Sequence, residues 1–406
     1  MVLKQTFVSF KIYNFRVFII GQGISMIGTW MQTIGLAWLV LQISHSGTTL
    51  GFVVALQFLP ILFFGMYGGL VADRFNKRKI LFITQFSFSI LALILGSLVL
   101  EKLITINLIY LFAILFGLVN TIDNPTRQSF VIEMVGRDKV RNAVTLNSTM
   151  VNSARVIGPS IAGILIATLG IGACFIANGL SYFMVLLALY LMRSNELYPA
   201  EIKQKTTKQI RIALKYVLSQ PKLKTTLIIM FIIGTFAYEF PVIYPLVAIK
   251  TFHGNAGTYA AMMTSAGLGA IVGSIYTASR KSTEIKQLLT ACFLFGLSII
   301  IASLMPTIIT LLVSLFIVGG LSIVFIALGN SLLQIEAAPQ MRGRVMSLWT
   351  IAFLGTTPIG GPIIGYIADH FSPRLGLATG GISAIIAAYV GYLVFKNTSK
   401  PVTTAN

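Results

Sequence analysis

The stretch GGLVADRFNKRKIL, residues 68–81, is a short polar segment with an apolar run on each side. The run before it covers 49–72 and the run after it covers 79–99. Each run is long enough to cross a bilayer, which takes about 20 mostly apolar residues. The segment between them carries Arg74, Lys77 and Arg78. Two apolar spans joined by a basic turn predict a helical hairpin in a membrane, with the turn on the cytoplasmic side.

The same alternation of apolar runs and polar turns extends over the chain, which has 406 residues, 56% of them hydrophobic and only 10% charged. An ordinary soluble domain carries about 25% charged residues. Twelve apolar runs are long enough to span: 17–43, 49–72, 79–99, 105–126, 143–168, 172–192, 225–249, 258–279, 286–305, 307–330, 345–368 and 374–396. None alternates as a barrel strand does, and backbone groups in lipid must be satisfied within the segment, so all twelve are predicted to be helices. The composition predicts an all-α membrane protein.

The net charge of +19 raises the question of a nucleic-acid partner, but the charge follows the predicted topology. With a cytoplasmic N-terminus, 26 of the 30 lysines and arginines fall on the cytoplasmic side. Lys102, Lys250 and Arg374 fall on the other side, and Arg155 lies inside a helix. This distribution predicts that both termini are cytoplasmic in a multi-pass protein of the cell membrane. It indicates contact with anionic lipid and not with nucleic acid.

The longest polar stretch lies between the sixth and seventh runs, at 193–224. Within it, apolar residues such as Ile210, Leu214 and Val217 are interspersed with lysine and arginine, which is typical of an amphipathic helix on a membrane surface. The stretch predicts three parts: a six-helix bundle at 1–192, a cytoplasmic linker at 193–224, and a second six-helix bundle at 225–406.

The two halves share a pattern at a constant offset of 203 residues. The matched pairs are Glu133 with Glu336, Arg141 with Arg344, and Pro159 with Pro362, each proline following a glycine. Parallel six-helix repeats with a substrate site between them near mid-membrane are the build of major facilitator transporters.

The segment 68–81 resembles the signature loop of the major facilitator superfamily. The matching positions are Gly69, Ala72, Asp73, Arg74, Lys77 and Arg78. Gly69 is expected to let two helices approach closely. Asn76 stands where the signature has a second glycine, and because asparagine tolerates positive φ, the turn is expected to survive. The resemblance implies a conformational latch formed by Gly69, Asp73, Arg74, Lys77 and Arg78. A plain basic turn is the alternative.

The sequence GPSIAG at 158–163 resembles the helix-five motif of efflux antiporters in this superfamily. Pro159 is expected to kink the helix, and Gly158 and Gly163 to allow close packing. Because Gly361 and Pro362 repeat the pattern in the second half, a structural kink without antiporter meaning stays open.

Three longer segments, 28–40, 56–74 and 123–159, resemble the transmembrane secretion effector branch of the superfamily. The branch includes enterobactin-type siderophore exporters and macrolide or multidrug efflux proteins. The resemblance implies the major facilitator fold, with twelve membrane helices in two six-helix pseudo-repeat bundles. It also implies a bacterial exporter that works by alternating access.

Charges placed among apolar residues are expected to pair, because an unpaired charge at the membrane centre costs about 3 kcal/mol. Arg155 is therefore predicted to face the bundle interior and to pair with Asp123 or Glu133. Two roles remain open for Asp123 and Arg155: an ion pair that holds helices four and five together, or a part in proton coupling.

Glu239, in TFAYEFPVIYP at 235–245, has no basic residue within ten positions on either side. A carboxyl group in such surroundings can bind a proton and release it when the site hydrates, which proton-coupled transport requires. Pro241 and Pro245 are expected to break helix seven just after it. The alternatives are a protonated packing residue and a position near the outer surface.

Polar and aromatic side chains are expected to line a substrate cavity suited to bulky, partly apolar ligands. These are Gln22, Trp30, Met31, Gln32, Trp38 and Gln57 in the first half, and Tyr238, Glu239 and Tyr244 in the second. Taken singly, each is also explained by packing.

These features predict a monomeric, proton-driven efflux antiporter for a small amphipathic compound such as a drug, a macrolide or a siderophore-like molecule. An ATP-driven pump would need a phosphate-binding loop with a Gly-Lys pair, and no such pair occurs. The proton gradient is therefore the expected driving force, and neither a cofactor nor a metal is expected. The sequence shows no catalytic nucleophile and no metal-binding cluster that would indicate an enzyme. An uptake symporter of the same fold, and a receptor or scaffold that has lost transport, are the alternatives.

Overall fold

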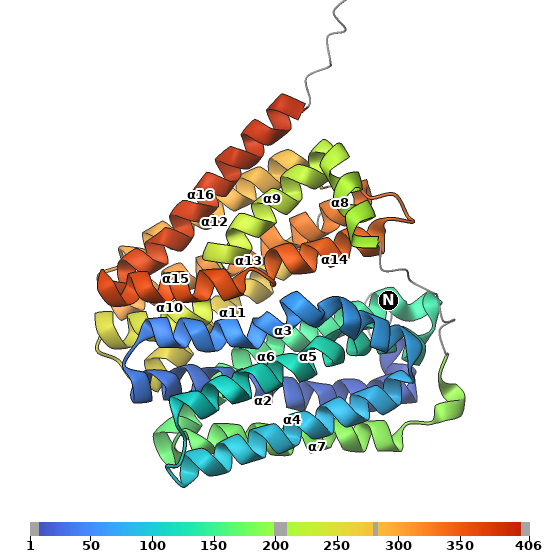
Figure 1. Ribbon diagram of the computed structural model, residues 1–406, viewed down its shortest axis with the longest axis horizontal. Coiled ribbons are helices and arrows are strands. Elements are labelled where there is room, and N and C mark those ends of the chain that lie inside the picture. The colour runs from blue at the N-terminus through green and yellow to red at the C-terminus, as the bar shows by residue number, and fades with distance from the viewer. Residues whose placement is uncertain (1–7, 199–208, 279–282, 399–406) are drawn as a thin grey trace, which may run out of the picture. The chain divides into compact units, whose positions relative to one another are not determined.

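The computed structural model describes residues 8–198, 209–278 and 283–398 (Figure 1). All regular structure in these ranges is helical. The long helices are α2 Tyr13–Ser44, α3 Gly47–Arg74, α4 Lys77–Leu100, α5 Ile106–Val135, α6 Val140–Leu169, α7 Gly172–Leu191, α11 Ala256–Ala278, α12 Ile285–Ser303, α13 Ile308–Glu336 and α16 Pro373–Thr398. The shorter ones are η1 Val8–Lys11, η2 Arg137–Lys139, η3 Ser194–Glu196, α8 Gln209–Ser219, α9 Pro221–Phe236, α10 Phe240–Leu246, η4 Val247–Thr251, α14 Arg342–Phe353 and α15 Thr357–His370.

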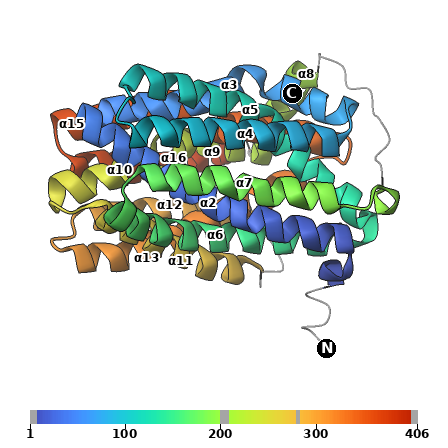
Figure 2. The same cartoon turned by 90° about the horizontal axis from the view of Figure 1, so that it is seen from below.

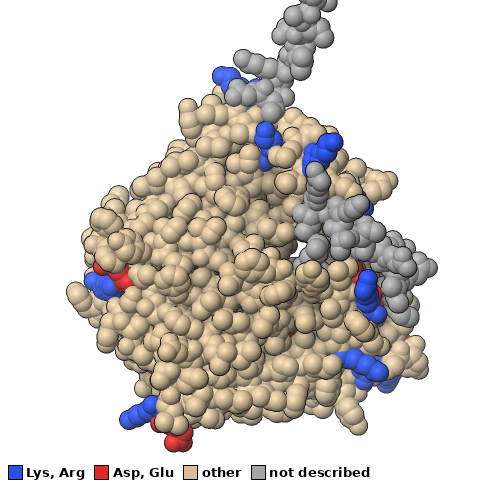
Figure 3. Space-filling view, viewed as in Figure 1, with Lys and Arg blue, Asp and Glu red and all other residues tan. Residues whose placement is uncertain are grey.

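Twelve helical spans in the described residues are long and apolar enough to cross a membrane, which confirms the twelve predicted runs. Two of them are interrupted. The seventh, Pro221–Thr251, consists of α9, α10 and the π-helical η4, and the eleventh, Arg342–His370, consists of α14 and α15. Figure 3 shows a face whose middle is almost free of charge, with lysines and arginines near its margins. The chain is a multi-pass, all-α membrane protein.

Polar caps fix the starts of several helices. Asn76 accepts a hydrogen bond from the Lys79 amide at 3.0 Å and so caps α4. Its φ is −62°, so the predicted positive φ at Asn76 is wrong. The extended conformation is the one that lets an N-cap side chain reach the first free amides of its helix. The turn therefore survives without glycine because asparagine works here as a cap.

The chain forms two compact units, each built from more than one segment. Unit 1 comprises Met1–His45, Leu56–Gln204 and Gly254–Thr264, and unit 2 comprises Ser46–Ala55, Lys205–His253 and Ser265–Asn406. The start of α3 thus belongs to unit 2 although the rest of the helix belongs to unit 1. The division at 193–224 into two bundles remains a prediction, and residues 199–208 of that linker lie outside the described residues.

Unit 1 is built around α2, which packs on α6 and α7, while α4 packs on α5 and α7. Figures 1 and 2 show α2, α4 and α7 running side by side. Aromatic side chains fill the core near one end of this unit, where Phe18 and Phe130 meet edge to face with their ring centroids 5.9 Å apart. These contacts fix the rotation of α2 and α5 about their axes.

Unit 2 is built around α9 and α16, which pack on each other, with α12 on α16 and with α14 and α15 on α9. The predicted amphipathic helix is present as α8. Val217 packs in a cluster with Leu223 and Val345 of α9 and α14, while Ile212 and Leu218 are 49% and 55% exposed. One apolar face of α8 therefore rests on protein, and further apolar side chains remain free for lipid.

Candidate functional site

Glu239 lies where the seventh span is interrupted. α9 ends at Phe236 and α10 begins at Phe240, with Glu239 at its N-cap position. The helix was predicted to break just after Glu239. This position is wrong, because α9 ends before Glu239. Pro241 stands in the first turn of α10, where its missing N–H is not needed, and Pro245 lies inside α10 just before η4. Glu239 is only 2% exposed.

The Glu239 carboxyl group faces the start of α15, the second half of the other interrupted span. The Thr357 side chain adjoins the carboxyl group, and Oε1 has no hydrogen-bond partner among the described residues. A Cβ placed at Gly360 would lie 3.1 Å from Oε1, and one at Gly361 would lie 3.5 Å from Oε2. The tight approach to the carboxyl group is thus at Gly360, whereas the predicted motif residue Gly361 lies at ordinary contact distance. Neither Thr357 nor Gly360 was predicted as a site residue.

A cluster of aromatic rings in unit 2 includes Tyr238 and Phe240, the two residues that flank Glu239. Tyr238 contacts Phe240, Phe295 and Phe353 at centroid distances of 5.4, 5.7 and 4.9 Å. The cluster extends from Phe240 to Tyr244, from Phe295 to Phe325 and from Phe353 to Trp349. The predicted lining residues Tyr238 and Tyr244 therefore belong to one ring cluster, with five further rings that sequence reasoning missed. Trp349 Nε1 is buried without a hydrogen-bond partner among the described residues.

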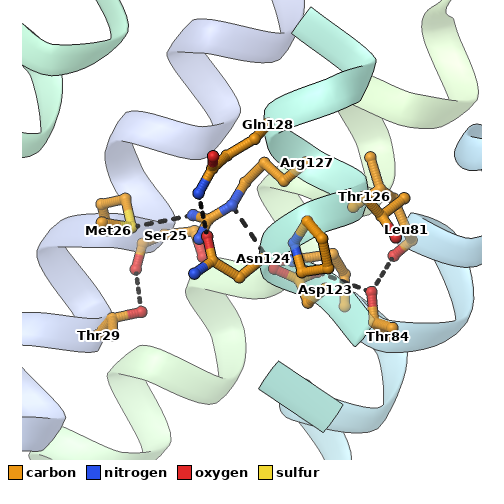
Figure 4. A network of polar contacts seen from close by, with 12 residues as sticks. Ser25, Met26, Thr29, Leu81, Thr84, Asp123, Asn124, Thr126, Arg127 and Gln128 are labelled. Atoms are coloured by element: carbon orange, nitrogen blue, oxygen red, sulfur yellow. Dashed lines mark hydrogen bonds and ion pairs between the residues drawn. The ribbon is translucent and has the colours of Figure 1, made fainter. Parts of the chain in front are cut away.

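A second buried carboxylate lies in unit 1, where Figure 4 shows its surroundings. Asp123 is 2% exposed and accepts hydrogen bonds from Thr84 Oγ1 at 2.7 Å and Gln85 Nε2 at 2.8 Å. Arg127, one turn along α5, approaches its Oδ2 with Nε at 3.6 Å, and the Arg127 guanidinium also reaches Met26 Sδ at 3.3 Å. This network links α4, α5 and α2, and the charge of Asp123 is compensated inside it.

Arg155 was predicted to pair with Asp123 or Glu133. The pairing with Asp123 is wrong, because the partners of Asp123 come from α4 and from its own helix, and the described ion pair of Glu133 is with Lys77. The Arg155 guanidinium lies over the Trp30 ring, 5.1 Å from its centroid. A cation over an indole face is attracted by the negative face of the ring. Gly158 makes room for this contact: a Cβ there would lie 2.5 Å from Trp30 Cβ.

The other predicted lining residues of unit 1 fall into separate surroundings. Gln32 accepts from Asn178 at 2.7 Å, in a chain that continues to Tyr182 and Thr29. Gln22 is 2% exposed, and its Oε1 has no partner among the described residues. Met31 lines an apolar groove of about 480 Å³ between α2, α6 and α7. Trp38 is buried and Gln57 half-buried. The structure of unit 1 does not gather these six residues at one place.

Two of the predicted latch residues, Lys77 and Arg78, have partners inside unit 1. Lys77 pairs with Glu133, Nζ to Oε1, at 2.6 Å. Arg78 donates to the Leu189 and Tyr190 carbonyls at 2.8 and 3.2 Å and to Ser194 Oγ. Asp73 is half-buried and Arg74 is exposed. These bonds tie the start of α4 to α5 and to the end of α7.

The close helix approach predicted at Gly69 occurs one residue earlier. A Cβ at Gly69 would have open space, whereas a Cβ at Gly68 would lie 2.0 Å from the Thr121 carbonyl oxygen of α5. A shift of one residue turns a side chain by about 100° around a helix, so only Gly68 faces α5. The prolines Pro159 and Pro362 lie inside α6 and α15, which continue through them. Gly163 faces the start of α11, with a Cβ position 3.1 Å from Ala260 Cβ.

Comparisons of the sequence with known proteins match almost the whole chain. A family model described as transmembrane secretion effector matches residues 4–402. The chain is 25% identical to the staphyloferrin A transporter of Staphylococcus aureus over 372 residues. The aligned region covers 91% of this chain and 93% of that protein. It is 24% identical over 376 residues to the enterobactin exporter EntS of Citrobacter koseri, with 92% and 89% covered.

Solved structures share the fold at lower identity. A bacterial homologue of the human lysosomal transporter Spinster, inward-facing and unoccupied, is similar with a TM-score of 0.73 at 15% identity, covering 95% of this chain and 96% of that one. A POT family transporter in complex with 5-aminolevulinic acid gives a TM-score of 0.76 at 13% identity, with 95% and 96% covered. At such identities the likeness shows the fold alone.

Proposed function

Because this chain belongs to the transmembrane secretion effector family of the major facilitator superfamily, we propose that it exports a small amphipathic compound in exchange for protons. The family and the similar proteins are transporters, so the chain is a transporter and not an enzyme. The proposed substrates are drugs, macrolides or siderophore-like molecules, and alternating access is the proposed mechanism.

The buried carboxyl group of Glu239 carries the proposal of proton coupling. Its polar neighbour is Thr357, while Oε1 has no hydrogen-bond partner among the described residues. A charged carboxylate in such a place would lack the pairing that a buried charge needs. Binding a proton removes that charge, and hydration of the site allows its release. Because both helices that meet here are interrupted, their halves can move separately around the carboxyl group.

The aromatic cluster beside Glu239 supports the proposed substrate class. Rings offer large apolar faces, while the Trp349 N–H is a buried donor without a partner among the described residues. A ligand with an aromatic body and hydrogen-bond acceptors matches both features. Two similar proteins are named a staphyloferrin A transporter and an enterobactin exporter, which favours a siderophore-like substrate, and the second name favours the outward direction.

The orientation and the remaining predicted roles are part of the same proposal. We place both termini in the cytoplasm, because that puts 26 of 30 basic residues on the inner side. Asp73 and Arg78 are proposed to hold one conformation through the signature loop, and Asp123 and Arg155 to assist coupling. A monomer is the proposed working form.

The experiment is transport in proteoliposomes with an imposed proton gradient, screening dyes, macrolides and catecholate siderophores. Antiport predicts that a compound accumulates on the proton-rich side and only when the gradient exists. Accumulation on the opposite side, together with protons, would indicate an uptake symporter. No flux of any compound would favour a receptor.

Glu239→Gln is the decisive variant, because it keeps the shape and removes the titrating group. It is expected to abolish gradient-driven movement while the protein still folds and binds substrate. Glu196→Gln is the matched control, since Glu196 is exposed and its partner Arg193 lies three residues away at 2.9 Å. Unchanged coupling in Glu239→Gln would remove this residue from the mechanism.

A further inference from the structure

The Asp369 carboxylate, in the last turn of α15, binds the first turn of α3. Its oxygens accept hydrogen bonds from the Gly47 and Thr48 amides, both at 2.8 Å, from Thr48 Oγ1 at 3.0 Å and from Ser46 Oγ at 2.9 Å. The first amides of a helix have no partner within the helix and attract negative charge. The first turn of α3 contains no acidic residue of its own. Asp369 therefore supplies the cap from another helix of unit 2.

Lys250 binds the same carboxylate, with Nζ 2.7 Å from Asp369 Oδ1. It belongs to η4, which continues from α10. One side chain thus joins three segments of unit 2: the start of α3, the end of α15 and the continuation of the helix that begins beside Glu239. The Asp369 side chain is only 13% exposed, so water replaces these partners poorly.

Next to Asp369, four glycines bring α3 and α15 into close contact. We call them the glycine seam: Gly47 and Gly51 on α3 with Gly361 and Gly365 on α15. A Cβ at Gly365 would lie 2.2 Å from the Gly47 oxygen, and one at Gly51 would lie 2.3 Å from the Gly361 oxygen. The two glycines of each helix are four positions apart, and Asp369 follows Gly365 after four more positions, so it lies at one end of the seam. At the other end, Gly361 adjoins Glu239 Oε2 at a Cβ distance of 3.5 Å.

We propose that Asp369 is a positioning residue for transport that holds the glycine seam closed. The closed seam keeps water at the Asp369 end of unit 2 from reaching Glu239. This inference rests on the proposed proton-binding role of Glu239. The described hydrogen bonds between the start of α3 and the end of α15 all run through Asp369, while glycines bring no side chains to the seam. Release of Asp369 therefore frees the start of α3 and opens a path to Glu239.

The test is proton leak in proteoliposomes without substrate, followed with a lumenal pH dye. Asp369→Asn is expected to raise the leak about tenfold or more, the factor that corresponds to losing one hydrogen bond to a charged group. The double variant Asp369→Asn with Glu239→Gln is expected to return the leak to the wild-type rate. If Asp369→Asn leaked only because its structure was damaged, the double variant would leak as fast as the single variant. Asp138→Asn, at an exposed acid in unit 1, is the control.

A second measurement follows the seam itself. Hydrogen exchange of the amides at 47–51 is expected to be faster in Asp369→Asn and unchanged in Glu239→Gln. Should Asp369→Asn not fold, Thr48→Val removes one bond to the carboxylate, keeps the amide bonds, and is expected to show the same changes at a smaller size.

The outcomes separate this inference from the proposed function. An unchanged leak in the folded variants, or a leak that persists without Glu239, overturns the role of Asp369 whatever Glu239 does. If Glu239→Gln alone keeps gradient-driven transport, the proposed function fails, and faster exchange at 47–51 would still show that Asp369 closes the seam.

Discussion

Glu133 and its repeat counterpart Glu336 each bind a lysine at the same distance, 2.6 Å from Nζ to Oε1. The lysines come from different places: Lys77 starts α4 in unit 1, and Lys222 lies in the first turn of α9 in unit 2. The two pairs also differ in exposure. The side chains of Lys77 and Glu133 are 8% and 11% exposed, whereas those of Lys222 and Glu336 are 47% and 29% exposed.

This difference predicts unequal costs for the same substitution. Lys77→Met leaves a buried carboxylate without its nearest cation and is expected to destabilise the protein by about 3 kcal/mol or more. Lys222→Met breaks an exposed pair and is expected to cost at most about 1 kcal/mol. Thermal unfolding in detergent, compared between the two variants, measures both. Equal losses of stability would contradict the ranking by burial.

Gly360 is predicted to be the least replaceable glycine beside Glu239. A Cβ there would lie 1.5 Å from the Thr235 carbonyl oxygen, so α9 and α15 must separate. Overpacking of this kind costs about 1–3 kcal/mol, and Gly360→Ala is expected to reach at least that. Gly343→Ala in α14 is the control, because a Cβ there meets open space. Unfolding temperatures of the two variants decide the matter, and similar values would argue against the close contact.

Asp123 is predicted to matter more for stability than an exposed acid. Asp123→Ala leaves Gln85 and Arg127 facing an empty site in a buried network, and the expected cost is about 3 kcal/mol. Asp138→Ala, at an exposed position, is expected to stay within about 0.5 kcal/mol of the wild type. Asp123→Asn keeps an acceptor for Thr84 and separates the two open roles. Loss of coupled transport in a stable Asp123→Asn protein would favour the coupling role over the structural one.

Trp349 is predicted to bind substrate through its N–H group. A buried donor without a partner costs about 1–3 kcal/mol, so Trp349→Phe is expected to keep or raise stability. If a substrate oxygen accepts from this group, the same variant raises the KM of export about tenfold with little change in maximal rate, again from the loss of one hydrogen bond. Tyr190→Phe, at a side chain 75% exposed, serves as the control. A KM equal to the wild-type value would exclude Trp349 from the binding site.

The spans could be predicted from the sequence because membrane insertion depends on length and hydropathy, which are local properties. The interruptions could be predicted only in part. Pro241 indicated irregular backbone near Glu239 but not the side on which it lies, since proline is tolerated in the first turn of a helix. The break of the eleventh span between Phe353 and Thr357 contains Gly355 and is followed by Pro358 in the first turn of α15, so it carries the same kind of local signal, which the prediction of an unbroken run 345–368 overlooked.

The candidate site shows where single-sequence reasoning ends. Glu239 could be found because a carboxyl group among apolar residues is itself a signal. Its neighbour Thr357 lies 118 positions away in the sequence and could not, because contacts between helices depend on their rotation and offset along the axis. The same limit explains why Asp123 was assigned the wrong partner and why Gly69 was chosen over Gly68. Each error amounts to a turn of one helix about its axis.

Both cysteines of the chain are fully buried: Cys174 lies near the Ala162 carbonyl oxygen, and the thiol of Cys292 meets the Ala384 carbonyl oxygen at 3.2 Å. A thiol held inside a helix bundle is out of reach of nitroxide reagents. Pairs of surface cysteines can therefore be spin-labelled on the otherwise native chain, without a cysteine-free background. Dipolar spectroscopy on such pairs would report how far apart the two units stand during each stage of the transport cycle.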